Sequence, residues 1–360
     1  MTEFQTSKSD FSSTRLVETD PISIEDGEIL LEINQFSFTA NNITYAVMGE
    51  KIRYWQFFPP SGDDKENWGI IPVWGFATIV ESKSDELPIG ERIFGYFPPA
   101  SNLKITPSNV SEYTFFDGSS HRSDLPPAYN LYRRVTKDPG TDSDSDKERM
   151  LLYPLFVTAF ALHDMLSMND WYGAEQVIIG SASSKTSIGL AYALAEDENA
   201  PSLVGLTSER NLKSVIDLGI YDTVTSYDQL TSIDASKAAV IVDMSGNGEM
   251  LAQLHSHLGD NMRFCSNVGL THWDAAKPSA GYIQERSEMF FAPGHIQKRI
   301  HDWGAEGFDK KSATFIERTA IKSRDWLVMT NIDGLQGLSD IYDDVCHGKI
   351  PPEKGLIIQM

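Results

Sequence analysis

The sequence predicts an α/β protein in which a β-rich region precedes a doubly wound parallel sheet. Before residue 137, short strand-like runs are interrupted by paired prolines, which break up any long helix. After residue 149, short apolar runs alternate with helical stretches, a pattern typical of parallel strands covered on both faces. The polar, acidic stretch between them, residues 137–149, is interpreted as a solvated loop or a domain boundary.

Length and charge limit the classes of function. The chain has 360 residues, which indicates about two domains. A formal net charge of -21 argues against general binding to nucleic acid or to an anionic membrane. We find no apolar run near the roughly 18–20 residues that span a bilayer, and no secretory signal. With Cys265 and Cys346 as the two cysteines, we expect a cytoplasmic protein without a disulfide framework or a cysteine-rich zinc site.

Three segments of the first region have strand or turn patterns. Residues 28–34 partly alternate between apolar and polar side chains, and residues 75–82 form a second strand-like run. Residues 88–95 (PIGERIFG) predict a turn followed by a short strand. Together these segments predict a small barrel or an irregular sheet.

The second region predicts strands and helices in alternation. Gly219 and Gly259 stand where glycines commonly end helices. In a sheet of this kind, ligands bind at the carboxyl ends of the strands, near the point where the strand order reverses. The predicted strands are residues 176–179, 202–206, 223–225, 238–242 and 264–268, and the predicted helices are residues 187–195, 209–218 and 248–258.

The turn after the first of these strands, residues 180–189 (GSASSKTSIG), favours a phosphate site. Small residues let a ligand approach the backbone, and the next helix offers N–H groups and the positive end of its dipole. The pattern is one residue short of a P-loop, and Ala182 and Lys185 break the glycine pattern G-x-G-x-x-G. The alternative is a close-packed turn with an exposed lysine. The side chains that could donate to phosphate are Ser183, Ser184, Lys185 and Thr186.

The end of the second strand favours NADP over NAD. An NAD-binding sheet typically places an acidic residue there for the ribose hydroxyls. This chain has Thr207 and Ser208, followed by Glu209 and Arg210. Hydroxyls and a permanently charged guanidinium suit the 2′-phosphate of NADP, although Glu209 suits neither cofactor. The alternative is that Ser208 only caps the next helix and that Arg210 is solvated.

Several blocks occur in a characteristic order along the chain. They are residues 29–37, Thr44-Tyr45 with Gly49, and residues 72–95, 157–160, 243–246, 267–269 and 347–358. These blocks and their order resemble the medium-chain dehydrogenase/reductase superfamily, on its zinc-independent quinone-oxidoreductase side. The resemblance implies a GroES-like catalytic domain at residues 1–150, completed by residues 296–360, and a Rossmann-type dinucleotide-binding domain at residues 151–295. It also implies a homodimer.

A binding site for NADP follows from the phosphate donors and the resemblance together. The substrate is expected to be a small molecule, a conjugated ketone, aldehyde or quinone. The expected cofactor-binding residues are Thr158, Gly180, Ser183, Ser184, Lys185, Thr186, Thr207, Ser208, Arg210, Asp243, Met244, Ser245, Asn267 and Val268.

Catalysis is expected to proceed without a metal. The chain has no cysteine before Cys265, which argues against the zinc site of the alcohol dehydrogenases. Negative charge that develops on a carbonyl oxygen then needs another donor. Tyr45 is the candidate catalytic residue because it matches the family's Thr-Tyr segment, and the alternative is a core residue. The aromatic stretches at residues 54–58 and 290–294 suit an apolar substrate pocket and core packing equally.

Two other classes of function remain open at this stage. The family often has an acidic residue just before its Thr-Tyr pair, and this chain has Ile43 there. Together with the altered glycine turn, this allows an NADPH-binding sensor or interaction protein that transfers no hydride. A lyase or hydrolase that uses the same pocket without redox chemistry is the third possibility. His163 and Asp164 are interpreted as a cap or packing pair rather than a catalytic dyad.

Overall fold

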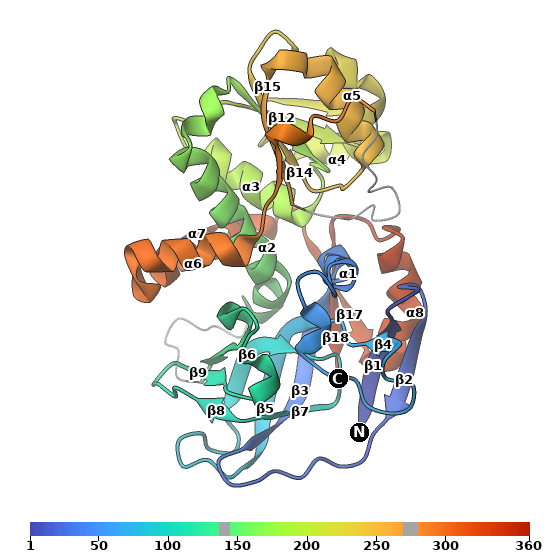
Figure 1. Cartoon of the computed structure of the whole chain (residues 1–360), viewed down its shortest axis with the longest axis vertical. Coiled ribbons are helices and arrows are strands. Elements are labelled where there is room, and N and C mark those ends of the chain that lie inside the picture. Colours follow the sequence, from blue (N-terminus) through green and yellow to red (C-terminus); the bar gives the residue numbers. More distant parts are fainter. Residues whose placement is uncertain (137–144, 269–279) are drawn as a thin grey trace. The chain divides into compact units, whose positions relative to one another are not determined.

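The computed structural model describes residues 1–136, 145–268 and 280–360, which form two compact units (Figure 1). The first unit combines Met1–Leu151 with Leu327–Met360, so both termini belong to it. The second unit is Leu152–Trp326. The chain therefore returns to the first unit at Leu327, whereas the sequence placed this return at residue 296.

Antiparallel pairing dominates the first unit. Its main sheet has the strand order β17-β18-β3-β5-β6-β10-β9-β8, with β7 beside β3, and a smaller sheet has the order β2-β1-β4. The strands are β1 (Thr2–Ser7), β2 (Thr14–Glu18), β3 (Ile29–Phe38), β4 (Trp68–Gly69), β5 (Val73–Ser82), β6 (Arg92–Phe97), β7 (Asn102–Ile105), β8 (Pro107–Ser108), β9 (Thr114–Asp117), β10 (Leu131–Arg134), β17 (Val328–Asp333) and β18 (Lys354–Gln359).

Strand β3 shows why the predicted β-rich region forms. Ile29, Leu31 and Ile33 are at most 1% exposed, so one face of the strand lies in the core. Strand β3 pairs with β5 with register shifts that mark bulges, and bulges bend and twist a sheet. The strands predicted at residues 28–34 and 75–82 are confirmed as β3 and β5, and residues 88–95 form a turn that leads into β6.

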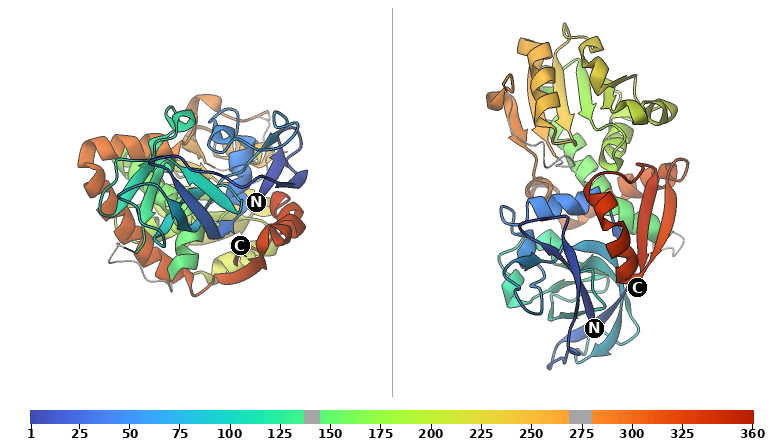
Figure 2. Two further views of the ribbon diagram at one scale, coloured as in Figure 1. Left: turned by 90° about the horizontal axis from the view of Figure 1, so that it is seen from below. Right: turned by 90° about the vertical axis from the view of Figure 1, so that its right-hand side faces the viewer.

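The second unit contains the parallel sheet that the sequence predicts. Its strand order is β13-β12-β11-β14-β15-β16, and every neighbouring pair is parallel. Figure 2 shows helices on both sides of this sheet, as expected for a doubly wound fold. The elements are β11 (Gln176–Gly180), β12 (Ser202–Thr207), β13 (Thr223–Ser226), β14 (Ala239–Asp243), β15 (Met262–Asn267), β16 (Ser287–Met289), α3 (Lys185–Ala195), α4 (Leu212–Asp217) and α5 (Gly248–Leu258).

Helical boundaries differ only locally from the prediction. The helix expected at residues 209–218 is a 3-10 turn, Glu209–Asn211, followed by α4. Gly219 and Gly259 follow α4 and α5 with φ of 64° and 52°, a conformation that glycine adopts without strain.

Apolar packing explains why residues 292–323 belong to the second unit. The helices α6 (Ala292–Trp303) and α7 (Ala305–Ser323) contribute Ile296 and Phe308 to a cluster with Ala161. Ala161 lies on α2 (Asp146–Met168). Phe160 of α2 packs on the same cluster, so the apolar contacts hold α6 and α7 to α2. The remaining helices, α1 (Ala40–Val47) and α8 (Gly334–Cys346), belong to the first unit.

Helix α2 corrects one expectation from the sequence. Within the part of the chain that the structure describes, it is the one helix long and apolar enough to cross a membrane. Half of its most apolar window is buried inside the protein, and Leu152, Phe156 and Leu162 are fully buried. A buried core helix has the same composition, so the apolar run is explained by packing. Residues 137–144 of the predicted boundary lie outside the described residues, and residues 146–149 begin α2.

Candidate functional site

The ends of four neighbouring strands bring most of the predicted cofactor residues to one edge of the parallel sheet. Gly180 ends β11, and its register partners are Leu206 on β12 and Asp243 on β14. Asp243 pairs in turn with Asn267, the last residue of β15. Because the strand order reverses beside β11, this edge is the place where a doubly wound sheet binds its ligand.

The turn that follows β11 is held by backbone and side-chain bonds. Ser181 has a φ of 55°, in the left-handed region, and the Ala182 N–H donates to the Leu206 carbonyl (3.0 Å). Ser184 is the N-cap of α3, and its Oγ accepts the Ser187 N–H (3.2 Å). The first turn of α3, which begins at Lys185, therefore presents its backbone N–H groups and its positive dipole end at the edge of the sheet.

Ser183 ties this turn to the end of β12. Its hydroxyl oxygen accepts from Asn211 Nδ2 (3.0 Å) and from Thr207 Oγ1 (3.5 Å). Ser183 and Thr207 are both buried. The sequence did not identify Asn211, because no spacing pattern links residue 211 to the turn at residue 183. This network fixes the distance between the two strand ends that would hold the adenosine half of a dinucleotide.

Two hydroxyls at this edge are buried and unsatisfied among the described residues. The Ser208 Oγ and the Ser226 Oγ have no hydrogen-bond partner there. Ser208 follows Thr207, the register partner of Ser226. Ser208 occupies the N-cap position of the 3-10 turn Glu209–Asn211, but its side chain makes no cap bond. A buried hydroxyl without a partner costs about 1–3 kcal/mol, and a ligand oxygen placed here would satisfy it.

The carboxylate at the end of β14 accepts hydrogen bonds from the loop that follows the strand. Asp243 is fully buried, and its Oδ1 accepts the Ser245 N–H (3.0 Å) and the Ser245 hydroxyl (2.7 Å). Its Oδ2 accepts the Gly246 N–H (2.8 Å). A Cβ on Gly180 would lie 2.5 Å from Asp243 Oδ1, so β11 needs a glycine at this point. Asp243, Met244 and Ser245 are buried and shape the edge of the sheet.

Tyr227 is a residue of this edge that the sequence did not reveal. It follows β13, hydrogen-bonds to Ser181 and lies near Asp243. Burial, followed by the negative charge of Asp243, raises the pKa of the Tyr227 phenol to about 12. The phenol is therefore neutral at physiological pH and supports the turn that follows β11.

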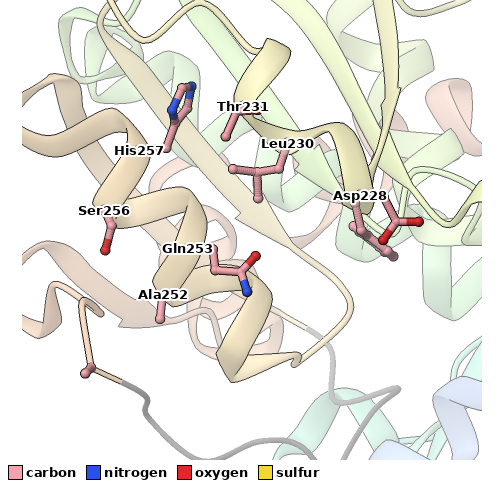
Figure 3. Close-up of a pocket in the computed structure, with 9 residues that line it drawn as sticks. Asp228, Leu230, Thr231, Ala252, Gln253, Ser256 and His257 are labelled. Carbon is pink, nitrogen blue, oxygen red and sulfur yellow. The ribbon is translucent and has the colours of Figure 1, made fainter.

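Tyr227 also lines a pocket of about 490 Å³ between the segment after β13 and helix α5 (Figure 3). His257 lies in this lining, and its Nε2 lies 2.8 Å from the Ile233 carbonyl oxygen. The neighbouring His255 is buried, and its Nδ1 accepts the Ile283 N–H (2.9 Å). The pocket is lined by Tyr227, Asp228, Leu230, Thr231, Ala252, Gln253, Ser256, His257 and Ala280.

The end of β15 adds an amide to the edge. Asn267 Nδ2 donates to the Tyr282 hydroxyl (2.9 Å), and the Asn267 carbonyl accepts the Phe290 N–H (2.8 Å). The Val268 N–H donates to the Asp243 carbonyl (2.9 Å). Gly269 of the expected motif lies outside the described residues.

Thr158 and Tyr45 lie on helices rather than at strand ends. Thr158 lies on α2, and its hydroxyl donates to the Pro154 carbonyl (2.8 Å). Tyr45 lies on α1 in the first unit and is 6% exposed. Its ring lies 4.7 Å from that of Tyr54 and 5.8 Å from that of Tyr96. Burial raises the pKa of the Tyr45 phenol well above its usual value, so the phenol is neutral at physiological pH.

The two aromatic stretches have different environments. Tyr54, Trp55, Phe57 and Phe58 are at most 6% exposed and form core. In the second stretch, Phe291 is 37% exposed. Within the described ranges, no group of three or more His, Cys, Asp or Glu side chains could hold a metal ion.

Solved structures confirm the fold. CurA from Vibrio vulnificus in complex with NADPH aligns with a TM-score of 0.63 at 13% identity, over 96% of this chain and 94% of that chain. Mycobacterial Rv1454c complexed with NADPH aligns with a TM-score of 0.58 at 11% identity, over 100% of both chains. CurK enoyl reductase aligns with a TM-score of 0.56 at 12% identity, over 100% of this chain and 99% of that chain. The resemblance to the medium-chain dehydrogenase/reductase superfamily is confirmed at the level of the fold.

Sequence comparisons give a family but no activity. No curated protein matches the sequence. One family model, described as "Protein of unknown function (DUF2855)", matches residues 36–351, which is most of the chain. The chain therefore belongs to the DUF2855 family and has the fold of the medium-chain dehydrogenases and reductases.

Proposed function

We propose that this protein is an NADP(H)-dependent, zinc-independent oxidoreductase that acts on a conjugated carbonyl or quinone-like small molecule. The observation that carries the proposal is the pair of buried hydroxyls at Ser208 and Ser226, which have no hydrogen-bond partner among the described residues; the exposed Arg210 follows Ser208 by two positions. Hydroxyl and guanidinium donors in one place suit a phosphate on a ribose. Two of the structures that share this fold are complexes with NADPH, and a third is named an enoyl reductase.

The chain's own residues divide into binding and shaping roles. The N-terminus of α3, with Lys185 and Thr186, would neutralise the pyrophosphate, while Ser208 and Arg210 would hold the 2′-phosphate. Asn267 and Val268 would face the nicotinamide half. When bound, NADPH supplies the hydride, and the protein contributes orientation and the exclusion of water.

A specific observation favours a second function, an NADPH-binding sensor without hydride transfer. Tyr45, the residue expected to stabilise charge on the substrate oxygen, is buried in an aromatic cluster. Packing in the core therefore accounts for this tyrosine without a catalytic role. In a sensor, cofactor binding would alter a surface for a partner, and catalytic competence would be unnecessary.

The two functions are separated by one pair of measurements. Fluorescence titration with NADPH and NADH gives the two dissociation constants, and NADPH oxidation is followed with cyclohexenone, trans-hexenal and naphthoquinone. We expect preferential binding of NADPH and turnover of at least one carbonyl. Binding without turnover would favour the sensor, and failure to bind either nucleotide would overturn both proposals.

A further inference from the structure

Asp164 and His295 form a buried dyad that the sequence did not suggest. His295 Nε2 lies 2.7 Å from Asp164 Oδ2, although the two residues are 131 positions apart. The two side chains are 11% and 13% exposed. His163, which precedes Asp164, pairs instead with Asp197 (3.0 Å). His163 and Asp164 therefore bond to different partners, far apart in the sequence.

A cation on α6 holds the carboxylate of this dyad in place. Arg299 Nη2 donates to Asp164 Oδ1 (3.0 Å), and Arg299 also pairs with Asp302 (2.9 Å). The Arg299 guanidinium lies 4.0 Å from the centre of the Trp303 ring. Arg299 thus links α6 to α2 independently of His295, and it offsets the charge of Asp164.

Phe290 links the dyad to the end of β15, one of the strands that carry the predicted cofactor residues. The His295 ring lies 5.9 Å from the Phe290 ring, and the Phe290 N–H donates to the Asn267 carbonyl at the end of β15. No hydrogen bond to His295 Nδ1 is found among the residues that the structure describes. One ring nitrogen is therefore oriented by a carboxylate, while the other makes no hydrogen bond to the described residues.

We propose that His295 is the proton donor of the reduction and that Asp164 is its positioning residue. This inference rests on the proposed function. Reduction of a conjugated carbonyl by a reduced nicotinamide adds one hydride and one proton to the substrate. His295 supplies the proton: its Nδ1–H bond breaks, an O–H bond forms with the electron pair on the substrate oxygen, and the neutral imidazole regains a proton from water. Asp164 keeps Nε2 protonated, so Nδ1 is the nitrogen that gives and regains the proton.

The charged groups that face His295 make this assignment chemically consistent. They are Asp164 on α2 and, behind it, Arg299 and Asp302 on α6.

A glutamine at this position separates proton donation from packing. The amide of His295→Gln can still donate to Asp164, but it carries no transferable proton at neutral pH. We expect kcat for enone reduction to fall roughly a hundred-fold or more, while the NADPH dissociation constant is unchanged. Asp164→Asn should lower kcat and leave KM and the NADPH dissociation constant unchanged. His163→Gln, on the same helix and with its own carboxylate partner, is the matched control and should match the wild type.

Chemical modification gives a readout that does not depend on turnover. Diethyl pyrocarbonate modifies accessible, unprotonated imidazole nitrogens, and mass spectrometry reports the extent at each histidine. If His295 Nδ1 faces the nicotinamide end of the site, NADP should slow its modification and leave the rate at His163 unchanged. Equal effects at both histidines, or no effect at either, would overturn the placement of His295.

The outcomes distinguish this inference from the proposed function. A wild-type protein that binds no NADPH, or that oxidises it with no carbonyl of the panel, removes both. A wild-type protein that turns over a carbonyl, with a His295→Gln variant that keeps kcat, removes only the role of His295.

Discussion

Replacing Ser208 with alanine should affect the empty and the loaded protein in opposite directions. The Ser208 Oγ is buried without a described partner and does not cap the helix that follows. A paired hydroxyl lost from a protein normally lowers stability. Removing an unpaired hydroxyl instead relieves a desolvation penalty. The unfolding free energy of the protein without cofactor should therefore rise by about 1 kcal/mol. For a unit of this size, that corresponds to roughly 2–4 °C in Tm.

The same substitution should weaken the cofactor complex. A hydrogen bond between the Ser208 hydroxyl and a charged phosphate oxygen is worth about 1.5–3 kcal/mol, or roughly ten- to a hundred-fold in Kd. NADPH should therefore raise the Tm of Ser208→Ala less than that of the wild type. Calorimetry with and without NADPH measures the changes in Tm, and fluorescence titration measures the change in the Kd for NADPH.

Ser202→Ala is the matched control for this experiment. Ser202 begins the same strand, β12, and its Oγ donates to the Glu175 carbonyl (3.0 Å) at the opposite edge of the sheet. Its loss should lower Tm slightly and leave the NADPH affinity unchanged. If Ser208→Ala instead lowers Tm and keeps its affinity for NADPH, the Ser208 hydroxyl serves the fold and the argument for a phosphate at this position is wrong.

Three further predictions follow from the same edge of the sheet and from the core behind it. Arg210→Ala should weaken NADPH roughly ten- to a hundred-fold and NADH far less, measured as two dissociation constants; equal losses would remove the preference for NADP. Gly180→Ala should destabilise the second unit by about 1–3 kcal/mol, because its Cβ would lie 2.5 Å from Asp243 Oδ1, and urea unfolding would detect this. Burial lowers the pKa of His255 to about 4. The free energy of unfolding should therefore fall by about 3 kcal/mol as the pH falls from about 6.5 towards 4, because the unfolded protein binds the proton first. Because the pKa is lower in the folded protein, the full stability is present above the pKa of the unfolded chain and is lost below it. His255→Phe should reduce this loss of unfolding free energy, measured by denaturant unfolding at a series of acidic pH values.

Sequence periodicity was sufficient to predict the parallel sheet and the edge at which its strands end. Strands such as Gln176–Gly180 and Ala239–Asp243 are short, fully buried runs that end in residues with turn chemistry. The order of strands along the chain then places their carboxyl ends together. The return of the chain at Leu327 was missed because α6 and α7 are polar on average, and their assignment depends on a few apolar contacts with α2.

Side-chain partners across the fold could not be predicted in the same way. Asn211 reaches Ser183, and His295 reaches Asp164, through contacts that no local spacing encodes. Tyr45 of α1 shows the converse. The pattern around it suggested a site, whereas its burial among aromatic rings depends on residues such as Tyr96 on strand β6. Composition indicates which groups are available, and only the fold decides which of them remain free for a ligand.

The turn at residues 180–189 keeps the glycines that packing requires. It lacks the glycines whose role in the G-x-G-x-x-G pattern is to let a ligand approach the backbone. A Cβ on Gly180 would meet Asp243, and a Cβ on Gly189 would lie 2.6 Å from the Phe156 ring, where α3 packs against α2. These two steric requirements are independent of any cofactor. Between them, Ser183 and Ser184 stand where small residues would suffice, and their hydroxyls bond to Asn211 and Ser187. The turn therefore retains its shape by hydrogen bonding, and the backbone N–H groups at the start of α3 remain oriented towards the edge of the sheet, where a pyrophosphate would bind.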